Sequence, residues 1–316
     1  MSILIHELVR RHALSPSQAR RLWQCASQPP ANWPVLLQRA LMLIAALLLG
    51  AGLIFWVAAH WPTQTRSFKL TLLQAAVFLP GALALFLPRA RNALLLLALL
   101  ALGGLLAFVG QTYQTGADAW QLFAAWVVLG FVWVLLARSD GLWAVWLSIA
   151  GTGLALWSGD ALLNPLADLF RRSPHPVALL ACWLPIWLWP WLLPYLPACA
   201  VDKARISQVL AALMALAAWT GEGLWGVFGS QALDLYAAAC ALVLLALILA
   251  WHRRALAVLT LALLSANTLF LAGCGRLFFS VKGIDPIMAF YGMAFLIATS
   301  IGLSVRWLHR LQKEAR

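Results

Sequence analysis

The side chains best suited to bind a ligand gather near the ends of long apolar segments. The candidate ligand-binding residues are His60, Trp61, Gln111, Tyr113, Asp118, Trp120 and Glu222, with Asp160 at a comparable position. Imidazole, amide, hydroxyl and carboxylate groups next to aromatic rings can hold a small solute or a lipid headgroup. The pattern therefore predicts a recognition or gating site. The alternative is that helix ends near water collect such residues without any ligand, and that Asp118 caps the segment after it.

The same residues give weak support for catalysis. His60 with Asp118 or Glu222 has the chemistry of an acid–base pair, but nothing in the sequence brings the partners together. The chain contains no H-E-x-x-H, G-x-S-x-G or G-x-x-x-x-G-K-[ST] motif. The five cysteines are isolated and indicate neither a disulfide framework nor a zinc site. The sequence therefore predicts no catalytic residue, no cofactor and no metal site.

Composition determines which elements must position these side chains. Of 316 residues, 64% are hydrophobic and 10% charged, with a mean hydropathy of +0.87, whereas a soluble domain carries roughly 25% charged residues. Crossing a bilayer takes about 20 apolar residues in a helix. The sequence therefore predicts an all-α polytopic transmembrane helical bundle over residues 36–316. The ten expected spans are 36–59, 68–87, 93–111, 119–137, 141–158, 177–197, 206–224, 234–251, 255–273 and 286–306.

The centres of the expected spans contain no charged residue. Proton- and ion-coupled transporters usually carry ionisable side chains there, so transport coupled to a buried carboxylate is disfavoured. The polar residues at mid-span are uncharged, namely Gln74, Thr152, Asn267 and Thr268. For Asn267 we favour a hydrogen bond between helices over a ligand contact.

The net charge of +12 indicates membrane orientation rather than a nucleic-acid partner, because the basic residues are scattered between apolar blocks. If the first span runs outward, 16 of the 22 Lys and Arg residues lie on the cytoplasmic side. The other six are Arg66, Lys69, Arg171, Arg172, Arg276 and Lys282. This bias follows the positive-inside rule. The sequence therefore predicts cytoplasmic N- and C-termini, contact with membrane lipids and no nucleic-acid partner.

Residues 1–35 are more polar and predict a cytoplasmic helical hairpin. Ser15, Pro16 and Gln18 match the cap, first turn and capping box of a helix. The hairpin either stabilises the cytoplasmic side or binds a protein partner, and the sequence leaves both interpretations open. No cleavable signal peptide is expected, because these residues are polar and the first apolar block is long enough to stay in the bilayer.

The sixth expected span is unusual because prolines interrupt an apolar run rich in tryptophan. These prolines are Pro185, Pro190, Pro194 and Pro197. Each internal proline removes a helical hydrogen bond, so we expect the span to be kinked or broken. Such a helix can line a substrate cavity, or it can be a bent scaffold helix with interfacial tryptophans.

Two segments of the chain resemble each other, GLIFWVAAHW over 52–61 and GLLAFVGQTY over 104–113. With the flanking runs 49–61 and 110–122, and with LSPSQARRL near the N-terminus, they also resemble the bacterial membrane proteins grouped as domain of unknown function 2157. The likeness covers roughly residues 1–160. It implies an inner-membrane location and about eight to ten or more helices, and it carries no activity to transfer. It favours His60, Trp61, Gln111, Tyr113, Asp118 and Trp120 over other polar residues.

The sequence therefore predicts a non-catalytic protein of the bacterial inner membrane that binds or transports a small solute or lipid. Its expected site is an outward-facing polar and aromatic pocket built from the candidate residues. The alternative is a structural or regulatory membrane subunit that transports nothing and acts through protein partners.

Overall fold

The structure is a computed structural model that describes residues 16–18, 33–59, 65–113, 116, 118–158, 176–196, 201, 204–229, 233–280 and 286–314. The described segments are helices with a few turn residues, and no strand occurs among them. The helices are α3 (Trp33–Ala59), α4 (Arg66–Phe86), α5 (Arg91–Tyr113), α6 (Ala119–Ala137), α7 (Asp140–Ser158), α8 (Pro176–Leu192), η2 (Leu193–Tyr195), α9 (Arg205–Phe228), α10 (Leu233–His252), α11 (Leu256–Ser280) and α12 (Pro286–Glu314). Most of the hairpin predicted over 1–35 lies outside the described residues.

The ten α-helices from α3 to α12 coincide with the ten expected spans. Nine of the helices within the described segments are long and apolar enough to cross a membrane, and α8 contributes a shorter apolar helix. The all-α polytopic bundle is therefore confirmed. Several helices continue beyond the apolar stretch that predicted them, because backbone hydrogen bonding continues into the polar flanks; α11 reaches Ser280 and α12 reaches Glu314.

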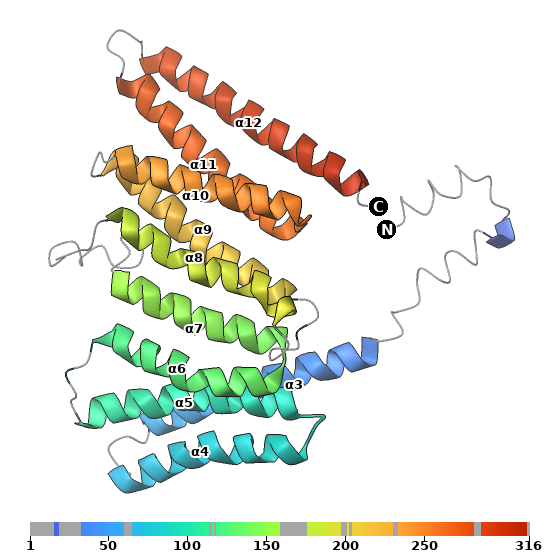
Figure 1. Cartoon of the computed structure of the whole chain (residues 1–316), viewed down its shortest axis with the longest axis vertical. Coiled ribbons are helices and arrows are strands. Elements are labelled where there is room, and N and C mark those ends of the chain that lie inside the picture. The colour runs from blue at the N-terminus through green and yellow to red at the C-terminus, as the bar shows by residue number, and fades with distance from the viewer. Residues whose placement is uncertain are drawn as a thin grey trace.

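The helices alternate in direction and follow one another along the longest axis of the molecule, with α4 at one end and α12 at the other (Figure 1). α5 packs against α3, α4 and α6, whereas α9 packs against α7, α8, α10 and α11. α12 packs against α11. The bundle is therefore an elongated row of helices rather than a ring around one axis.

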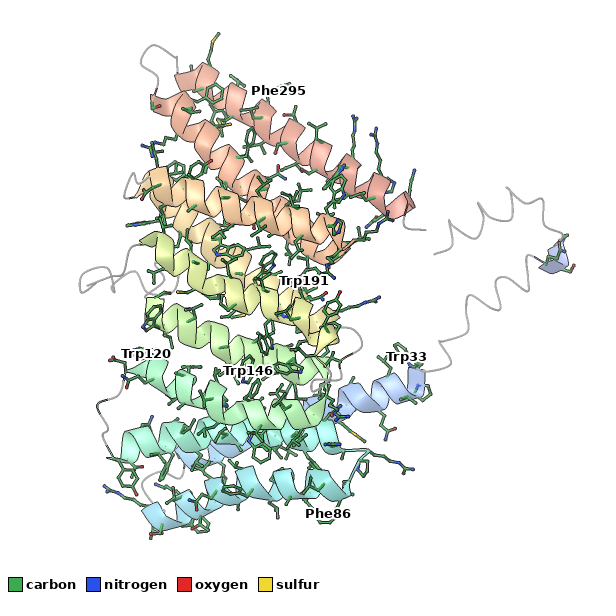
Figure 2. All side chains as sticks on the ribbon, in the orientation of Figure 1. Trp33, Phe86, Trp120, Trp146, Trp191 and Phe295 are labelled. Atoms are coloured by element: carbon green, nitrogen blue, oxygen red, sulfur yellow. The ribbon has the colours of Figure 1, made fainter. Side chains whose placement is uncertain are left out.

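Two large hydrophobic cores and two smaller clusters between α4 and α5 hold the described helices together. One core joins α8, α9, α10 and α11 around Trp183, Trp187 and Trp219, and the other joins α5, α6, α7 and the end of α8 around Leu99 and Trp143. Figure 2 shows Trp146 between neighbouring helices and Trp120 at the start of α6. Indole N–H groups lock adjacent helices, since Trp126 Nε1 donates to the Leu99 carbonyl at 2.8 Å and Trp146 Nε1 to the Val127 carbonyl at 2.8 Å.

Glycines occupy the closest approaches between helices, as small residues do in membrane bundles. A Cβ at Gly153 would lie 2.8 Å from the Cβ of Phe123, and a Cβ at Gly223 would lie 2.9 Å from the Cβ of Ala239. Any side chain at these two positions would force the helices apart.

The expected interruption of the sixth span occurs later than the first prolines suggest. α8 stays helical through Pro185 and Pro190, then changes to the 3₁₀ turn η2, which contains Pro194. Trp183, Trp187 and Trp191 recur every fourth residue and are buried. Packing of this tryptophan face offsets the hydrogen bonds that the two internal prolines remove, so the prediction of a break holds at η2 and not within α8.

The predicted interhelical role of Asn267 is confirmed. Its Nδ2 donates to Ser304 Oγ at 2.9 Å, and its Oδ1 accepts from Ser300 Oγ at 2.7 Å. Both serines belong to α12. By contrast, Thr152 and Thr268 donate to carbonyls of their own helices.

α3 begins and α12 ends on the same side of the row (Figure 1). We call this the basic side. Within the described segments, its helix ends and turns carry Arg89, Arg91, Arg138, Arg205, Arg253, Arg254, Arg306, Arg310 and Lys313. The opposite side carries Arg66, Lys69 and Arg276.

Candidate functional site

The structure places part of the predicted ligand-binding set on one pair of neighbouring helices. Gln111 and Tyr113 lie in the last turn of α5, Asp118 directly precedes α6, and Trp120 lies in the first turn of α6. All four are on the side opposite the basic side. Tyr113 is 66% exposed, Gln111 and Asp118 are exposed, and Trp120 is half-buried. His60, Trp61 and Asp160 lie outside the described residues.

Glu222 lies apart from this group. It is buried near the end of α9, and α6 and α7 separate α9 from α5 along the row (Figure 1). The outward helix ends can converge only if the spans surround a common axis. The helices form a row instead, so the end of α9 lies away from the end of α5. Ligand binding at the α5–α6 end stays a prediction, with Gln111, Tyr113, Asp118 and Trp120 as its candidate residues.

Asp118 lies at the N-cap position of α6, but its side chain does not make the cap hydrogen bond. Its backbone is extended, with φ −63° and ψ 153°, and its carbonyl accepts from the Gln121 N–H at 3.0 Å. The carboxylate makes no cap hydrogen bond. The capping interpretation is therefore confirmed for the backbone position alone.

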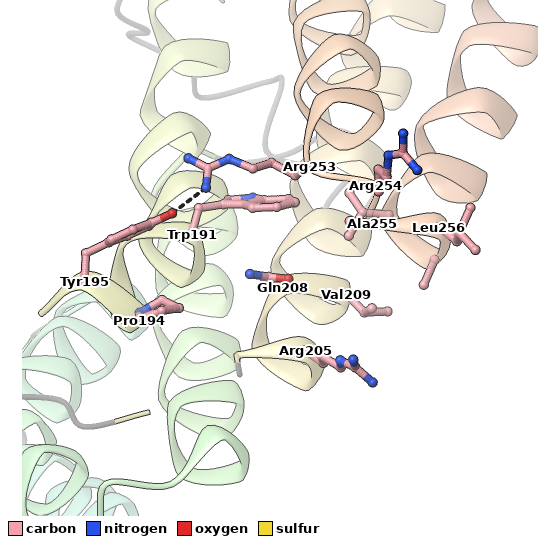
Figure 3. Close-up of a pocket in the computed structure, with 12 residues that line it drawn as sticks. Trp191, Pro194, Tyr195, Arg205, Gln208, Val209, Arg253, Arg254, Ala255 and Leu256 are labelled. Carbon is pink, nitrogen blue, oxygen red and sulfur yellow. Dashed lines mark hydrogen bonds between the residues drawn. The ribbon is translucent and has the colours of Figure 1, made fainter. Parts of the chain in front are cut away.

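The basic side holds a hollow of about 530 Å³ that we call the arginine pocket. It lies between the end of α8 with η2, the first turns of α9, and the turn that joins α10 to α11 (Figure 3). Its polar lining comes from Arg205, Arg253, Arg254, Tyr195, Gln208 and Trp191. The described residues that line it include no acidic side chain.

Arg253 is fixed by an aromatic partner. Its Nη1 donates to the Tyr195 hydroxyl at 2.6 Å, and its guanidinium carbon lies 5.7 Å from the centroid of the Tyr195 ring. Figure 3 shows Arg253 above Trp191 and the Tyr195 ring to one side, with a dashed line for the hydrogen bond. One hydrogen bond uses only one of the five guanidinium N–H groups, so the others can bind an anion.

Arg254 stands where the backbone favours glycine. Its φ is 52°, in the left-handed region. The Arg254 N–H donates to the Trp251 carbonyl at 3.0 Å, and the Ala255 N–H donates to the Ala250 carbonyl at 3.0 Å, which is the Schellman pattern of a helix end. The left-handed conformation costs an L-residue roughly 1–2 kcal/mol. The turn therefore displays an arginine side chain at the pocket despite a cost that glycine would avoid.

Asp140 positions the α9 side of the pocket. Its carboxylate accepts from the backbone N–H groups of Ile206 at 2.7 Å and Ser207 at 3.1 Å, and from Ser207 Oγ at 2.5 Å. A residue of α7 thus caps the start of α9 with charge-assisted hydrogen bonds. This cap fixes the first turn of α9, which carries Arg205 and Gln208.

Sequence reasoning missed both the pocket and its cap. In the sequence, Arg205, Arg253 and Arg254 indicate only membrane orientation, and no pattern marks Asp140 as a cap for α9. The sequence does contain a signal, because Arg253 and Arg254 form a doublet in a very short connection between two apolar spans. Recognising it would have required knowing that α9 lies beside α11.

Two further features of the described residues bear on function. A second hollow of about 490 Å³ lies on the basic side between the start of α3, the α4–α5 turn and Ser139, with Gln38, Arg89 and Asn92 in its lining. Among the described residues, no group of three or more His, Cys, Asp or Glu side chains is placed to hold a metal ion.

These features define the class of the chain as a polytopic α-helical membrane protein. Residues 6–143 match the model of a family described as predicted membrane protein, domain of unknown function 2157, which confirms the resemblance noted in the sequence. The match includes α3 to α6 with Gln111, Tyr113, Asp118 and Trp120, whereas the arginine pocket lies beyond it. No match was found among curated proteins or among solved structures.

Proposed function

We propose that this protein belongs to the bacterial inner membrane and binds the anionic group of a small solute or lipid at the arginine pocket. The observation that carries the proposal is the placement of Arg205, Arg253 and Arg254 on one hollow, whose described lining contains no acidic side chain. Guanidinium groups bind phosphate and carboxylate oxygens through paired hydrogen bonds. Tyr195 and Gln208 add uncharged polar groups.

In this proposal the basic side faces the cytoplasm, with both ends of the chain there. The distribution of Arg and Lys between the two sides supports this orientation through the positive-inside rule. The rings of Trp251 and Trp307 lie 4.5 Å apart near the basic ends of α10 and α12 and indicate that a membrane interface lies at this level. Such rings prefer the level of the lipid headgroups. The arginine pocket therefore opens toward the cytoplasm.

We favour binding over transport or catalysis. The pocket lies at helix ends, while the buried rings of Trp187 and Trp219 fill the space between α8 and α9. The part of the pocket lining that the structure describes contains neither a histidine nor a carboxylate to act as a general base.

The test is a thermal-stability titration of the purified full chain with glycerol 3-phosphate, at constant ionic strength. A ligand that binds only the folded state stabilises it by about 2.7 kcal/mol at 100 times its Kd. We expect the melting temperature to rise with glycerol 3-phosphate and not with glycerol. The rise should disappear in the triple variant Arg205→Gln, Arg253→Gln, Arg254→Gln.

The matched control is the triple variant Arg306→Gln, Arg310→Gln, Lys313→Gln, which removes as many cations from the same side but outside the pocket. It should respond like the natural chain. Equal responses of the two triple variants, or no response of the natural chain, would contradict the proposal.

A structural or regulatory subunit is the second candidate function. The hollow of about 490 Å³ at the start of α3 favours it, because it offers polar side chains directly after the segment 1–32. Deleting residues 1–30 should then abolish copurification of a stable partner, while Arg89→Ala should weaken it. Purification of the full chain from its native membrane without any stoichiometric partner would contradict this candidate.

A further inference from the structure

A third hollow lies along the contact between α9 and α11, about one helical turn beyond the arginine pocket. It measures about 250 Å³, and its lining is almost entirely apolar. Small residues form part of it, namely Ala217 and Gly221 of α9 with Ser265 of α11, and leucines flank them. We call this hollow the acyl groove, for the role argued below.

The arginine pocket and the acyl groove lie on the same faces of the same two helices. On α9, Arg205 and Val209 line the pocket and Leu213 lines the groove, at successive steps of four residues. On α11, Ala257 and Val258 line the pocket and Leu261 lines the groove. Steps of three and four residues keep side chains on one helix face. One helical turn therefore separates the polar hollow from the apolar one on each helix.

We propose that the α9–α11 seam binds one anionic phospholipid, with its phosphate at the arginine pocket and an acyl chain in the acyl groove. The inference deepens the proposed function, on which it rests, by naming the class of ligand. Charge selects the headgroup, since three arginines line the pocket, none of its described lining residues is acidic, and the carboxylate of Asp140 is already hydrogen-bonded to Ile206 and Ser207. The apolar continuation selects a hydrocarbon chain over a purely polar solute.

The dimensions agree with this assignment. At a rise of 1.5 Å per residue, Leu213 lies about 12 Å and Leu224 about 28 Å deeper than Arg205 along α9. The hydrocarbon core of a bilayer is about 30 Å thick, so one leaflet spans about 15 Å. An acyl chain that starts near the arginines therefore reaches the groove at Leu213 and ends near the midplane, while the part of the groove toward Leu224 lies in the opposite leaflet. A phosphate at Arg205 sits at the interface, where cytoplasmic-leaflet lipids carry their anionic groups.

The experiment is native mass spectrometry of the full chain in detergent with dioleoyl phosphatidylglycerol, its dihexanoyl analogue and dioleoyl phosphatidylcholine. We expect the natural chain to bind the dioleoyl phosphatidylglycerol at least tenfold more tightly than either comparison lipid. Ala217→Phe should fill the groove and lower the affinity for the long-chain lipid about tenfold, while leaving the dihexanoyl affinity unchanged. Ala241→Phe, the same substitution at an exposed alanine of α10, should change neither affinity.

The outcomes separate the two proposals. If glycerol 3-phosphate binding depends on the three arginines but chain length and Ala217→Phe have no effect, the phospholipid site is wrong and the anion site stands. If the triple arginine variant binds phosphatidylglycerol as the natural chain does, both are wrong. The chain-length comparison uses the natural protein, so the inference is tested even if Ala217→Phe does not fold.

Discussion

At the scale of single residues, the polar groups of the arginine pocket and of the Asp140 cap lie at helix ends and in turns. Asp140, Arg205 and Arg253 come from different helices, and only their packing places them together. The sequence identifies such residues as polar and terminal, but it does not contain their distances. This is why the arginines were assigned to orientation alone, and why Glu222 was grouped with Gln111 and Tyr113 although α6 and α7 lie between them.

Asp140→Ala should destabilise the start of α9. It removes an ionised acceptor shared by three donors, and hydrogen bonds to charged groups contribute about 1.5–3 kcal/mol each. We expect a loss of about 2–3 kcal/mol in the free energy of unfolding, measured by denaturant titration in mild detergent. Asp234→Ala is the control, since Asp234 is exposed in the first turn of α10. Equal stability of the two variants would argue against the cap.

Arg254→Gly should have opposite effects on stability and binding. Glycine adopts the left-handed φ of 52° without the cost that an L-side chain carries, so we expect the variant to be more stable by about 1 kcal/mol. Loss of the guanidinium should weaken glycerol 3-phosphate binding about tenfold. The control Arg253→Gly, outside the left-handed region, should lose binding without gaining stability. Unchanged binding in Arg254→Gly would remove this residue from the pocket.

At the scale of elements, length and composition predicted nearly everything that is local. The ten spans agree with the ten α-helices because each apolar run must be helical to satisfy its own backbone in hydrocarbon. The effect of the prolines in α8 was harder to predict, since tryptophan packing against neighbouring helices keeps the segment helical through Pro185 and Pro190. Contacts between helices cannot be predicted from one helix alone, except where a polar side chain such as Asn267 requires a partner.

Asn267→Ala should loosen α12 from α11. The side chain joins Ser300 and Ser304 across that contact, and interhelical hydrogen bonds in membranes contribute about 0.6–2 kcal/mol. We expect faster proteolysis within α12 and a fall of about 1–2 kcal/mol in the free energy of unfolding. Thr268→Val removes only a bond within α11 and should have a smaller effect. Equal effects of the two substitutions would contradict the interhelical role.

At the scale of the whole molecule, the row of helices distinguishes two sides by charge. Labelling of single cysteines in intact cells, in a background where the natural cysteines are replaced, tests which side faces the cytoplasm. A membrane-impermeant maleimide should label Tyr113→Cys in intact cells, because Tyr113 is exposed on the less basic side. It should label Arg91→Cys only after the cells are opened. The reverse pattern would invert the orientation and place the arginine pocket outside the cell.

The row also accounts for the proposed lipid site. A ring of helices would enclose its polar groups, whereas a row leaves the seam between α9 and α11 open along its length. The most direct measurement is a density map of the full chain in nanodiscs that contain phosphatidylglycerol. We predict a phosphate between Arg205 and Arg254, with a continuous chain reaching the acyl groove beside Ala217. A map with ordered lipid elsewhere on the bundle and none along this seam would contradict the account.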